Sequence, residues 1–379
     1  MRVCLVCPYD LSVPGGVGKH ALALAERLRA LGDDAEVIGP ASERGALPPY
    51  VTGFAGVASI HGNESDNRIG ILTSPWAVRR YMRRRSFDVL HVHEPLLPAL
   101  AYYALWSAAA RARVCTFHCY SEDESTVTRI GRKLASSLLR RFDRGLAVSE
   151  PAARHARIVW RRSLSVVPNG VDTRFFAAPV RAIERAEPLR LLFVGQWMDR
   201  RKGLSVLLAA CEHLRAQSVE FRLDVVGRGD TSTERASPIP GVVFHGTVSE
   251  EVLRQHLLAS AVFVSPALGC ESFGMLLLEA MAAGRPVLCS DIEGYRQLGS
   301  SAGVHLVPPG NAAALADAIA RLGRAPDLRE LMGRQNAIHA REYDWTPIAL
   351  RVRQEYELAL GATVDSQGTR LTASLASAP

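Results

Sequence analysis

Lysine is scarce in this chain of 379 residues, and its cysteines do not suggest disulfides. Among 45 basic residues only three are lysines, so almost every cation is an arginine; the three are Lys19, Lys133 and Lys202. The seven cysteines are odd in number and scattered along the chain. This usage favours reduced thiols and a cytoplasmic setting over a disulfide framework.

Long apolar runs are also missing. The longest, residues 96–110, contains Pro98 and is shorter than the ~20 residues that span a bilayer, so we expect a buried helix there. Met1-Arg2 leads directly into a short apolar strand. We therefore expect no secretory leader.

Charge is unevenly distributed. Residues 1–170 carry a net charge of +8 and residues 171–379 a net charge of −1. The excess indicates that the first half of the chain meets an anionic partner, either a membrane surface or a nucleic acid. The nucleic-acid alternative is the weaker one, because the arginines lack interleaved aromatic residues and no known nucleic-acid-binding module occurs. We expect no nucleic-acid partner.

Short β-branched runs alternate with helical patterns, which predicts an α/β protein with parallel sheets and crossover helices. Expected helices include 17–31, 75–85, 98–110 and 127–142. A chain of this length exceeds the ~250–300 residues of a single core. We predict two Rossmann-like domains, residues 1–168 and 188–345, joined by the turn-rich stretch 164–188 and followed by a disordered tail, residues 361–379.

The most informative segment is Glu271-Ser272-Phe273-Gly274-Met275-Leu276-Leu277-Leu278-Glu279. Ser272-Phe273-Gly274 predicts the start of a helix that continues through Ala283, and free backbone N–H groups at such a start favour an anion. With a diphosphate held on the N–H groups of residues 273–276, Glu271 would face sugar hydroxyls and Glu279 a ribose, because carboxylates accept hydrogen bonds from vicinal diols. The segment suits a nucleotide sugar.

Further motifs follow one another along the chain. They are Val6–Tyr9 with Val13–Val17, Asp88–Pro95, Thr116–His118, Val167–Asp172, Arg201–Gly203 and Val226–Asp230. Together with the Glu-x7-Glu pattern, they resemble the retaining nucleotide-sugar glycosyltransferases of family four, which have the GT-B fold. Within that family the chain is most similar to the bacterial phosphatidylinositol α-mannosyltransferases, and the resemblance extends to about residue 345.

The resemblance implies two Rossmann-like domains facing a central cleft, with the helix 346–360 packing back on the first domain. In the family, the loop matching Gly16 lies over the donor diphosphate, where glycine lets backbone approach closely. Arg201 and Lys202 would supply positive charge to the leaving diphosphate. The family usually has arginine where this chain has Gln196. Either Arg200 or Arg201 compensates for that change, or donor binding and turnover are weakened.

The resemblance also implies that His118, at the end of a predicted strand, touches the transferred sugar. The catalytic candidates are His118, Lys202, Arg201 and Glu271. His91 and His93 share one strand face, but we expect them to be structural, because no third metal ligand is near them in sequence.

The chain contains no Asp-x-Asp motif, which argues against a metal-bridged diphosphate. We expect neither a metal nor a cofactor. No nucleophile–base pair is conspicuous, which fits the family's proposed front-face retaining mechanism, in which the departing phosphate oxygen takes the acceptor proton.

Acceptor residues are also implied by the resemblance. Asn63, Ser65 and Arg68 match the positions that hold the lipid phosphate and inositol, with Tyr9 beside the ring. An arginine with small hydrogen-bonding residues suits a phosphodiester. Gly18 stands where the family has glutamine, which bears on recognition of the inositol ring.

Residues 75–85 predict an amphipathic helix. Its apolar face would contain Ala77, Val78, Tyr81 and Met82. The opposite face would carry an indole and four guanidinium groups, those of Trp76, Arg79, Arg80, Arg83 and Arg84. This combination suits anionic lipid headgroups.

The sequence as a whole predicts a metal-independent retaining mannosyltransferase that uses GDP-mannose and a phosphatidylinositol-type lipid. We expect it to be cytoplasmic and peripheral at the inner face of the plasma membrane. One alternative keeps the enzyme class, with a UDP-sugar and a soluble or secondary-metabolite acceptor. Another, motivated by Gln196, is a sugar-nucleotide-binding protein without turnover.

Overall fold

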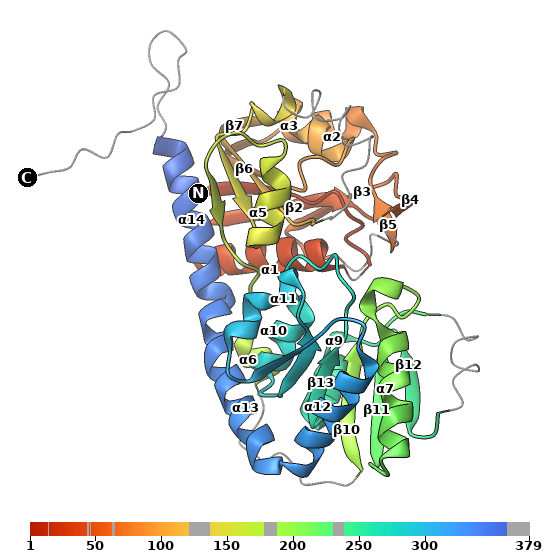
Figure 1. Ribbon diagram of the computed structural model, residues 1–379. Helices are drawn as coiled ribbons and strands as arrows, with labels where there is room; N and C mark the ends of the chain where they lie inside the picture. Colours follow the sequence, from red (N-terminus) through yellow and green to blue (C-terminus); the bar gives the residue numbers. More distant parts are fainter. Residues whose placement is uncertain are drawn as a thin grey trace, which may run out of the picture. The chain divides into compact units, whose positions relative to one another are not determined.

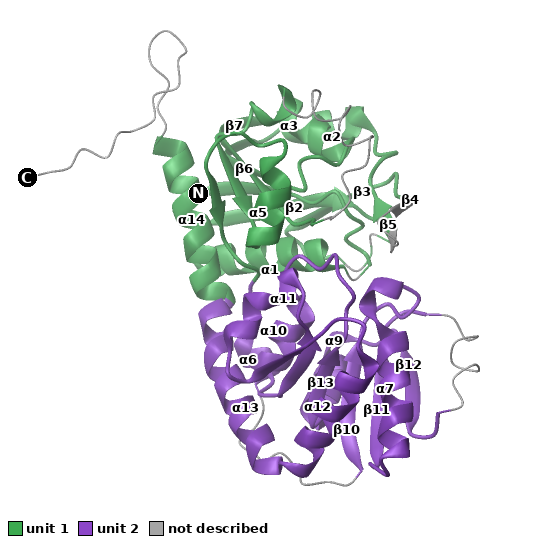
Figure 2. Cartoon of the chain, viewed as in Figure 1, with its two compact units in different colours: residues 1–169, 345–379 green, residues 170–344 purple. Residues whose placement is uncertain are grey.

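The chain forms two compact units, residues 1–169 with 345–379 and residues 170–344 (Figure 2). A computed structural model describes residues 1–13, 15–43, 45, 47–62, 65–120, 137–177, 188–229 and 239–361, excluding the side chains of residues 60–62, 65 and 66. The tail expected at 361–379 lies outside these residues from 362 onward.

Unit 1 contains a seven-stranded sheet in the order β3-β2-β1-β6-β7-β8-β9, with every neighbouring pair parallel (Figure 1). The strands are β1 (Arg2–Val6), β2 (Asp34–Pro40), β3 (Val51–Phe54), β6 (Ser86–His93), β7 (Ala109–Phe117), β8 (Arg144–Ala147) and β9 (Leu164–Val166). A separate antiparallel pair is formed by β4 (Ala58–Gly62) and β5 (Ser65–Ile69).

Helices cover both faces of this sheet, which explains why its central strands are apolar on both sides. One core holds β1 residues Val3 and Leu5 together with α1 (Gly16–Ala30) and α14 (Trp345–Gly361). The other holds Cys4 and Val6 with α2 (Pro75–Arg83), α3 (Leu100–Ser107) and α5 (Glu150–Arg157).

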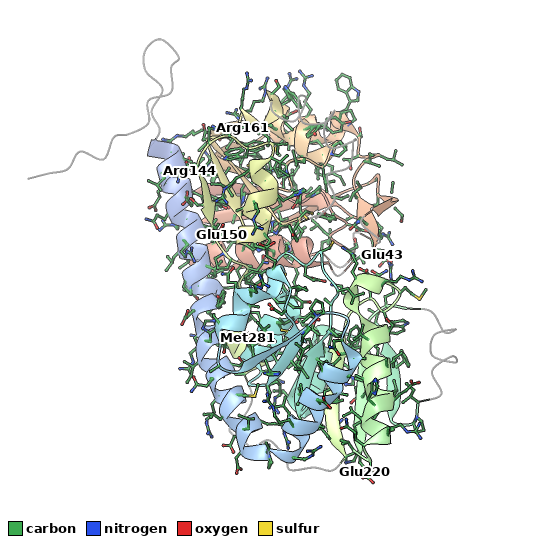
Figure 3. The ribbon with its side chains drawn as sticks, in the orientation of Figure 1. Glu43, Arg144, Glu150, Arg161, Glu220 and Met281 are labelled. Carbon is green, nitrogen blue, oxygen red and sulfur yellow. The ribbon has the colours of Figure 1, made fainter. Side chains whose placement is uncertain are left out.

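The last helix, α14, contacts α1, β6 and β7. It is also fixed by polar contacts. Arg144 of β8, labelled in Figure 3, donates a hydrogen bond from Nε to Glu355 of α14, and the Tyr356 hydroxyl lies 2.7 Å from Nδ1 of His91.

Unit 2 contains a six-stranded parallel sheet in the order β12-β11-β10-β13-β14-β15 (Figure 1). The strands are β10 (Leu189–Val194), β11 (Phe221–Val226), β12 (Val242–Gly246), β13 (Val262–Ser265), β14 (Val287–Ser290) and β15 (Val304–Val307). The helices are α6 (Thr173–Phe176), α7 (Leu204–Ala216), α9 (Glu250–Ala259), α10 (Met275–Ala282), α11 (Glu293–Arg296), α12 (Ala312–Arg324) and α13 (Pro326–Ala340), with 3-10 turns η1 (Arg200–Lys202), η2 (Leu298–Ser300) and η3 (Arg341–Tyr343).

Two cores lie on the two faces of this sheet as well. The first packs α7 and α12 on β10, β11 and β13. The second contains α10, whose Met281 is fully buried and is labelled in Figure 3. The predicted α/β class with two Rossmann-like parallel sheets is confirmed.

Some predicted boundaries were wrong. The helix expected at 98–110 ends at Ser107, because Ala109 already pairs with Ser86 as the first residue of β7. The expected connection 164–188 contains β9 and α6. The helix expected at 127–142 falls mostly outside the described residues. No helix in the described parts of the chain is long and apolar enough to cross a membrane.

Candidate active site

The sequence candidates of unit 2 gather at the carboxyl ends of β10 and β13, the edge where open α/β sheets bind ligands. The first element there is η1. Asp199 caps it by accepting a hydrogen bond from the Arg201 backbone N–H at 3.0 Å. Gly203 ends it at a φ of 72°, and a Cβ at that position would lie 1.9 Å from the carbonyl oxygen of Pro266. Only glycine allows this close approach of the two loops.

Lys202, on this turn, donates a hydrogen bond from Nζ to Oε1 of Glu271, in the loop after β13. The side chains are 28% and 19% exposed, so the ion pair lies at the surface without being fully solvated. The structure thus joins two of the four predicted catalytic side chains, which are 69 positions apart in sequence.

Arg201 has a partner within its own loop. Its guanidinium donates two hydrogen bonds to Asp199, from Nε at 3.0 Å and from Nη2 at 2.7 Å. These two hydrogen bonds offset much of the positive charge of the guanidinium and hold η1 in place. Lys202 is therefore the cation that reaches Glu271, and Arg201 supports the loop.

The helix predicted at the Glu-x7-Glu segment begins later than expected. Helix α10 starts at Met275, not at Ser272, because Gly274 has a φ of 91° and acts as the N-cap. Within the described residues no side chain caps α10, so its first backbone N–H groups face outward from the helix end. Phe273 is 1% exposed and belongs to a core of unit 2.

The remaining donor candidates are divided between the two units. Glu279 is on α10 and is buried. Gln196 is half-buried in the loop after β10, next to Gly195, whose carbonyl oxygen would lie 2.0 Å from a Cβ on Gly227. In unit 1, Gly16 is the exposed first residue of α1, a helix whose N-cap is glycine as well.

In unit 1, His118 directly follows β7 and is 7% exposed. Its backbone N–H and that of Cys119 both donate to Oε1 of Glu94. Glu94 is itself buried, with a φ of 48°. Burial raises the pKa of the Glu94 carboxyl, while the two N–H donors lower it. Glu94 thus fixes the backbone that presents His118.

The fold brings two further histidines to His118. Nδ1 of His93 lies 3.0 Å from Nε2 of His118, and the His20 ring centroid is 4.8 Å from that of His118. Nδ1 of His20 is 2.8 Å from Oδ1 of Asn169. Burial lowers the pKa of His20 to about 4 and holds those of His93 and His118 well below the usual range. All three imidazoles are neutral at physiological pH.

The expectation that His93 is structural rested on its neighbours in sequence; in the fold, one ring nitrogen from each of His20, His93 and His118 lies within 4.8 Å of the others. By geometry alone the trio could hold a metal ion. His91, in contrast, is structural, as expected. Its Nδ1 meets Tyr356 and its Nε2 meets Oγ1 of Thr116, each at 2.7 Å.

A second polar cluster, Asp224 with His245 and His256, could also offer three ligand atoms. Oδ1 of Asp224 already accepts hydrogen bonds from Nη2 of Arg222 at 3.0 Å and from Nε2 of His245 at 2.7 Å. Nη2 of Arg190 lies 3.8 Å from Oδ2 of Asp224. The two guanidinium groups balance the carboxylate charge and disfavour a cation.

Of the acceptor candidates of unit 1, Tyr9 lies next to Cys119, the residue after His118. Tyr9 forms a β-bridge with Ile69, and its hydroxyl is 3.8 Å from Sγ of Cys119. Nε of Arg68 is 3.1 Å from Oδ2 of Asp10, so this guanidinium is partly neutralised and still 38% exposed. Asn63 and the side chain of Ser65 lie outside the described residues.

Helix α2 carries the predicted basic face. It ends at Arg83, and its buried side is formed by Val78 and Met82. Ala77, expected on that side, is exposed. Trp76 is 76% exposed, and the preceding Leu72 is 71% exposed. The four arginines predicted on the basic face are exposed: Arg79, Arg80, Arg83 and Arg84.

Comparison with known proteins defines the class. The profile described as "Glycosyltransferase Family 4" matches residues 14–175, and that described as "Glycosyl transferases group 1" matches residues 188–324. Among solved structures, sucrose-phosphate synthase from Thermosynechococcus elongatus has a TM-score of 0.75 at 20% identity, covering 96% of this chain and 100% of the other. Anabaena Alr3699/HepE in complex with UDP and glucose has a TM-score of 0.72 at 18% identity, covering 94% and 99%. The chain belongs to glycosyltransferase family 4 and has the GT-B fold.

Within that family the chain is similar over nearly its full length to proteins named phosphatidyl-myo-inositol mannosyltransferase. The one from Mycobacterium leprae is 36% identical, covering 98% of this chain and 99% of the relative. The one from Mycolicibacterium smegmatis is 35% identical, covering 97% and 96%.

Sequence reasoning missed His20, Asn169, Glu94 and Asp199 as parts of the site. His20 follows the Pro-Gly-Gly turn, and Glu94 and Asn169 lie inside motifs already recognised. The polar character of Glu94 and Asn169, shortly after strands, was a usable signal, whereas His20 lies within α1 and Asp199 in the loop before η1. The partner that each of these residues contacts in the fold could not be predicted from the sequence.

Proposed function

We propose that this glycosyltransferase moves mannose from GDP-mannose to a phosphatidylinositol-type lipid, with retention of anomeric configuration and without a metal. The observation that carries the proposal is the Lys202–Glu271 pair in unit 2, beside the start of α10. The full-length similarity to proteins named phosphatidyl-myo-inositol mannosyltransferase supports the substrates.

The donor would be bound by unit 2. The backbone N–H groups at the start of α10 and the Lys202 ammonium would stabilise the negative charge that develops on the leaving diphosphate. Glu271 would accept hydrogen bonds from sugar hydroxyls, and Glu279 from the ribose. This arrangement supplies positive charge from the chain itself, which is why we propose a metal-independent reaction.

The transfer would proceed on one face of the sugar. The bond between the anomeric carbon and the diphosphate oxygen breaks, a bond forms from that carbon to the acceptor hydroxyl oxygen, and the departing phosphate oxygen takes the hydroxyl proton. His118 would contact the transferred sugar. Because burial keeps its imidazole neutral, it acts by hydrogen bonding and adds no charge.

The acceptor would be bound by unit 1. Arg68 would contact the lipid phosphate and Tyr9 would lie beside the inositol, with Asn63 and Ser65 as further polar contacts. The exposed arginines of α2, with Trp76 and Leu72, would hold the protein on an anionic membrane. We therefore propose a cytoplasmic, peripheral protein at the inner face of the plasma membrane.

Transfer of labelled mannose from GDP-mannose to phosphatidylinositol vesicles tests the donor site. Lys202→Ala and Glu271→Ala should each lower kcat/KM by about 30- to 1,000-fold, equivalent to roughly 2–4 kcal/mol of transition-state stabilisation. Arg334→Ala and Glu330→Ala, which remove the two halves of an exposed ion pair on α13, are the matched controls. Near-normal turnover by either site variant would exclude the assignment.

The same assay separates the alternatives. It is run with a panel of GDP- and UDP-sugars, with phosphatidylinositol or soluble inositol phosphate, and with EDTA. Preference for a UDP-sugar and a soluble acceptor would favour the alternative that keeps the enzyme class and changes both substrates. Nucleotide-sugar binding without turnover would favour the non-catalytic alternative. Loss of activity in EDTA that a divalent ion restores would refute metal independence.

Vesicle sedimentation tests the membrane surface. A variant with glutamine at Arg79, Arg80, Arg83 and Arg84 should bind anionic vesicles more weakly by about 1 kcal/mol per arginine, and raised salt should have the same effect on the wild type. A variant with glutamine at four exposed arginines of unit 2 is matched in charge: Arg321, Arg324, Arg334 and Arg341. Equal loss in both variants, or no preference of the wild type for anionic vesicles, would contradict the role of α2.

A further inference from the structure

The hydrogen bond between His93 and His118 leaves one proton position to be decided. Nδ1 of His93 and Nε2 of His118 are 3.0 Å apart, and both rings are buried. Burial lowers both pKa values, and the neighbouring histidines lower them further. Since both rings are neutral, a single hydrogen lies between these nitrogens, and either ring can be the donor.

The other nitrogen of His93 distinguishes the two arrangements. Nε2 of His93 is buried and has no hydrogen-bond partner in the part of the chain that the structure describes. If His118 donated from Nε2, His93 would carry its proton on Nε2 as a buried N–H without an acceptor. If His93 donates from Nδ1, Nε2 keeps only a spare lone pair. Buried N–H groups without acceptors are the rarer and costlier case, so His93 is the donor.

We propose that His93 is a positioning residue that fixes His118 in the tautomer with its proton on Nδ1, so that His118 offers an N–H donor to the substrate. The consequence for catalysis rests on the proposed contact between His118 and the sugar. Nε2 of His118 is occupied by His93, so Nδ1 is the ring atom left for a ligand. An Nδ1–H can donate to a hydroxyl or phosphate oxygen, but it cannot take a proton. His118 is therefore a hydrogen-bond donor and not a general base.

The surrounding side chains hold this pair in place. The His20 ring packs edge-on against both, with centroids 5.3 Å from His93 and 4.8 Å from His118. With Nδ1 of His20 on Oδ1 of Asn169, His20 also carries its proton on Nδ1. Glu94 fixes the His118 backbone from the other side. Rotation of the His118 ring away from His93 would disturb its packing against His20.

Long-range proton–nitrogen NMR spectra of histidine-labelled protein report the tautomer directly, without any need for activity. The His118 signals are assigned by their absence in His118→Ala. We expect protonated Nδ1 and unprotonated Nε2 in wild-type His118. His93→Phe, which keeps a ring and removes the donor, should give a mixture of tautomers. His93→Asn, which places an amide donor near the position of Nδ1, should restore the wild-type pattern.

Kinetics form the second arm. His93→Phe should lower kcat by about 10- to 100-fold, as for other residues that orient a functional histidine, with the KM for the nucleotide sugar within about two-fold of wild type. His93→Asn should recover most of kcat. If His93→Phe does not fold, the wild-type spectrum alone decides the tautomer.

Three results would overturn the proposal. The first is a wild-type His118 that is protonated on Nε2, and the second is an unchanged His118 tautomer in His93→Phe. The third is stoichiometric binding of added zinc that is lost in His20→Ala, because the three rings would then be metal ligands. Full transfer activity in His118→Ala would instead refute the sugar contact in the proposed function and leave the tautomer assignment untouched.

Discussion

Acid should destabilise unit 1 strongly, because its fold buries neutral imidazoles. Burial lowers the pKa of His20 to about 4 and that of His91 to about 3, against roughly 6.5 for histidine in an unfolded chain. Between these values the unfolded state binds more protons than the folded state, so the free energy of unfolding falls as pH falls. The stabilisation associated with each histidine is complete above pH ~6.5 and is lost as the pH falls towards the folded-state pKa.

Each of these two histidines should remove about 2 kcal/mol of stability between pH 7 and pH 5. His93 and His118 act in the same direction. Urea unfolding at several pH values measures the effect, with a Trp197→Phe background so that the remaining tryptophans report on unit 1 alone. The ring of one of them, Trp345, lies 5.2 Å from that of His20.

Substitution of a single imidazole sharpens this measurement. His20→Gln should reduce the number of protons taken up on unfolding by up to one. The slope of the free energy of unfolding against pH should then fall by up to about 1.4 kcal/mol per pH unit. His213→Gln, which removes an exposed imidazole on α7, is the matched control and should leave the dependence unchanged. A free energy of unfolding that stays flat from pH 7 to pH 5 would refute the picture of buried neutral histidines.

Three further substitutions test individual features of unit 2. Gln196→Arg should tighten GDP binding by about 1.5–3 kcal/mol in calorimetry if the loop lacks a cation for the diphosphate, and an unchanged affinity would mean that the exposed Arg200 fills that role. Cys270→Gly should raise stability by about 0.5–1 kcal/mol in thermal unfolding, because Cys270 has a φ of 57°; a lower melting temperature would contradict this strain. Gly294→Ala should weaken nucleotide binding by about 1–3 kcal/mol, because its Cβ would lie 1.8 Å from the Glu271 carbonyl oxygen, whereas Gly361→Ala, with open space around it, should bind normally.

Periodicity in the sequence was sufficient for the class of fold and most strands, because parallel strands buried on both faces appear as continuous apolar runs. It was insufficient where local pattern and tertiary pairing compete. Residues 98–110 read as one apolar helix, yet Ala109 joins β7. At α10, the position of the helix start depends on the left-handed conformation of Gly274, which the residue type permits without requiring.

The site residues show the same limit. The importance of Lys202 and Glu271 could be inferred from motifs, but their ion pair spans 69 positions. The hydrogen bond between His20 and Asn169 spans 149 positions. The Asp199 partner of Arg201 was not predicted, because Asp199 is only two positions away and carries no motif of its own. A charged residue in a functional loop can serve the loop instead of the ligand.

Two pairs of candidate site residues differ in charge, and the difference follows from burial. In unit 2, Lys202 and Glu271 form an ion pair and are 28% and 19% exposed. In unit 1, His93 and His118 are buried in a cluster that keeps them neutral. In the proposed function, Lys202 and the start of α10 would supply fixed positive charge to the anionic leaving group. A sugar hydroxyl needs only a directed hydrogen bond, and a neutral imidazole with a fixed tautomer would provide it. Under that proposal, burial decides which of these side chains suits a diphosphate and which suits a sugar hydroxyl.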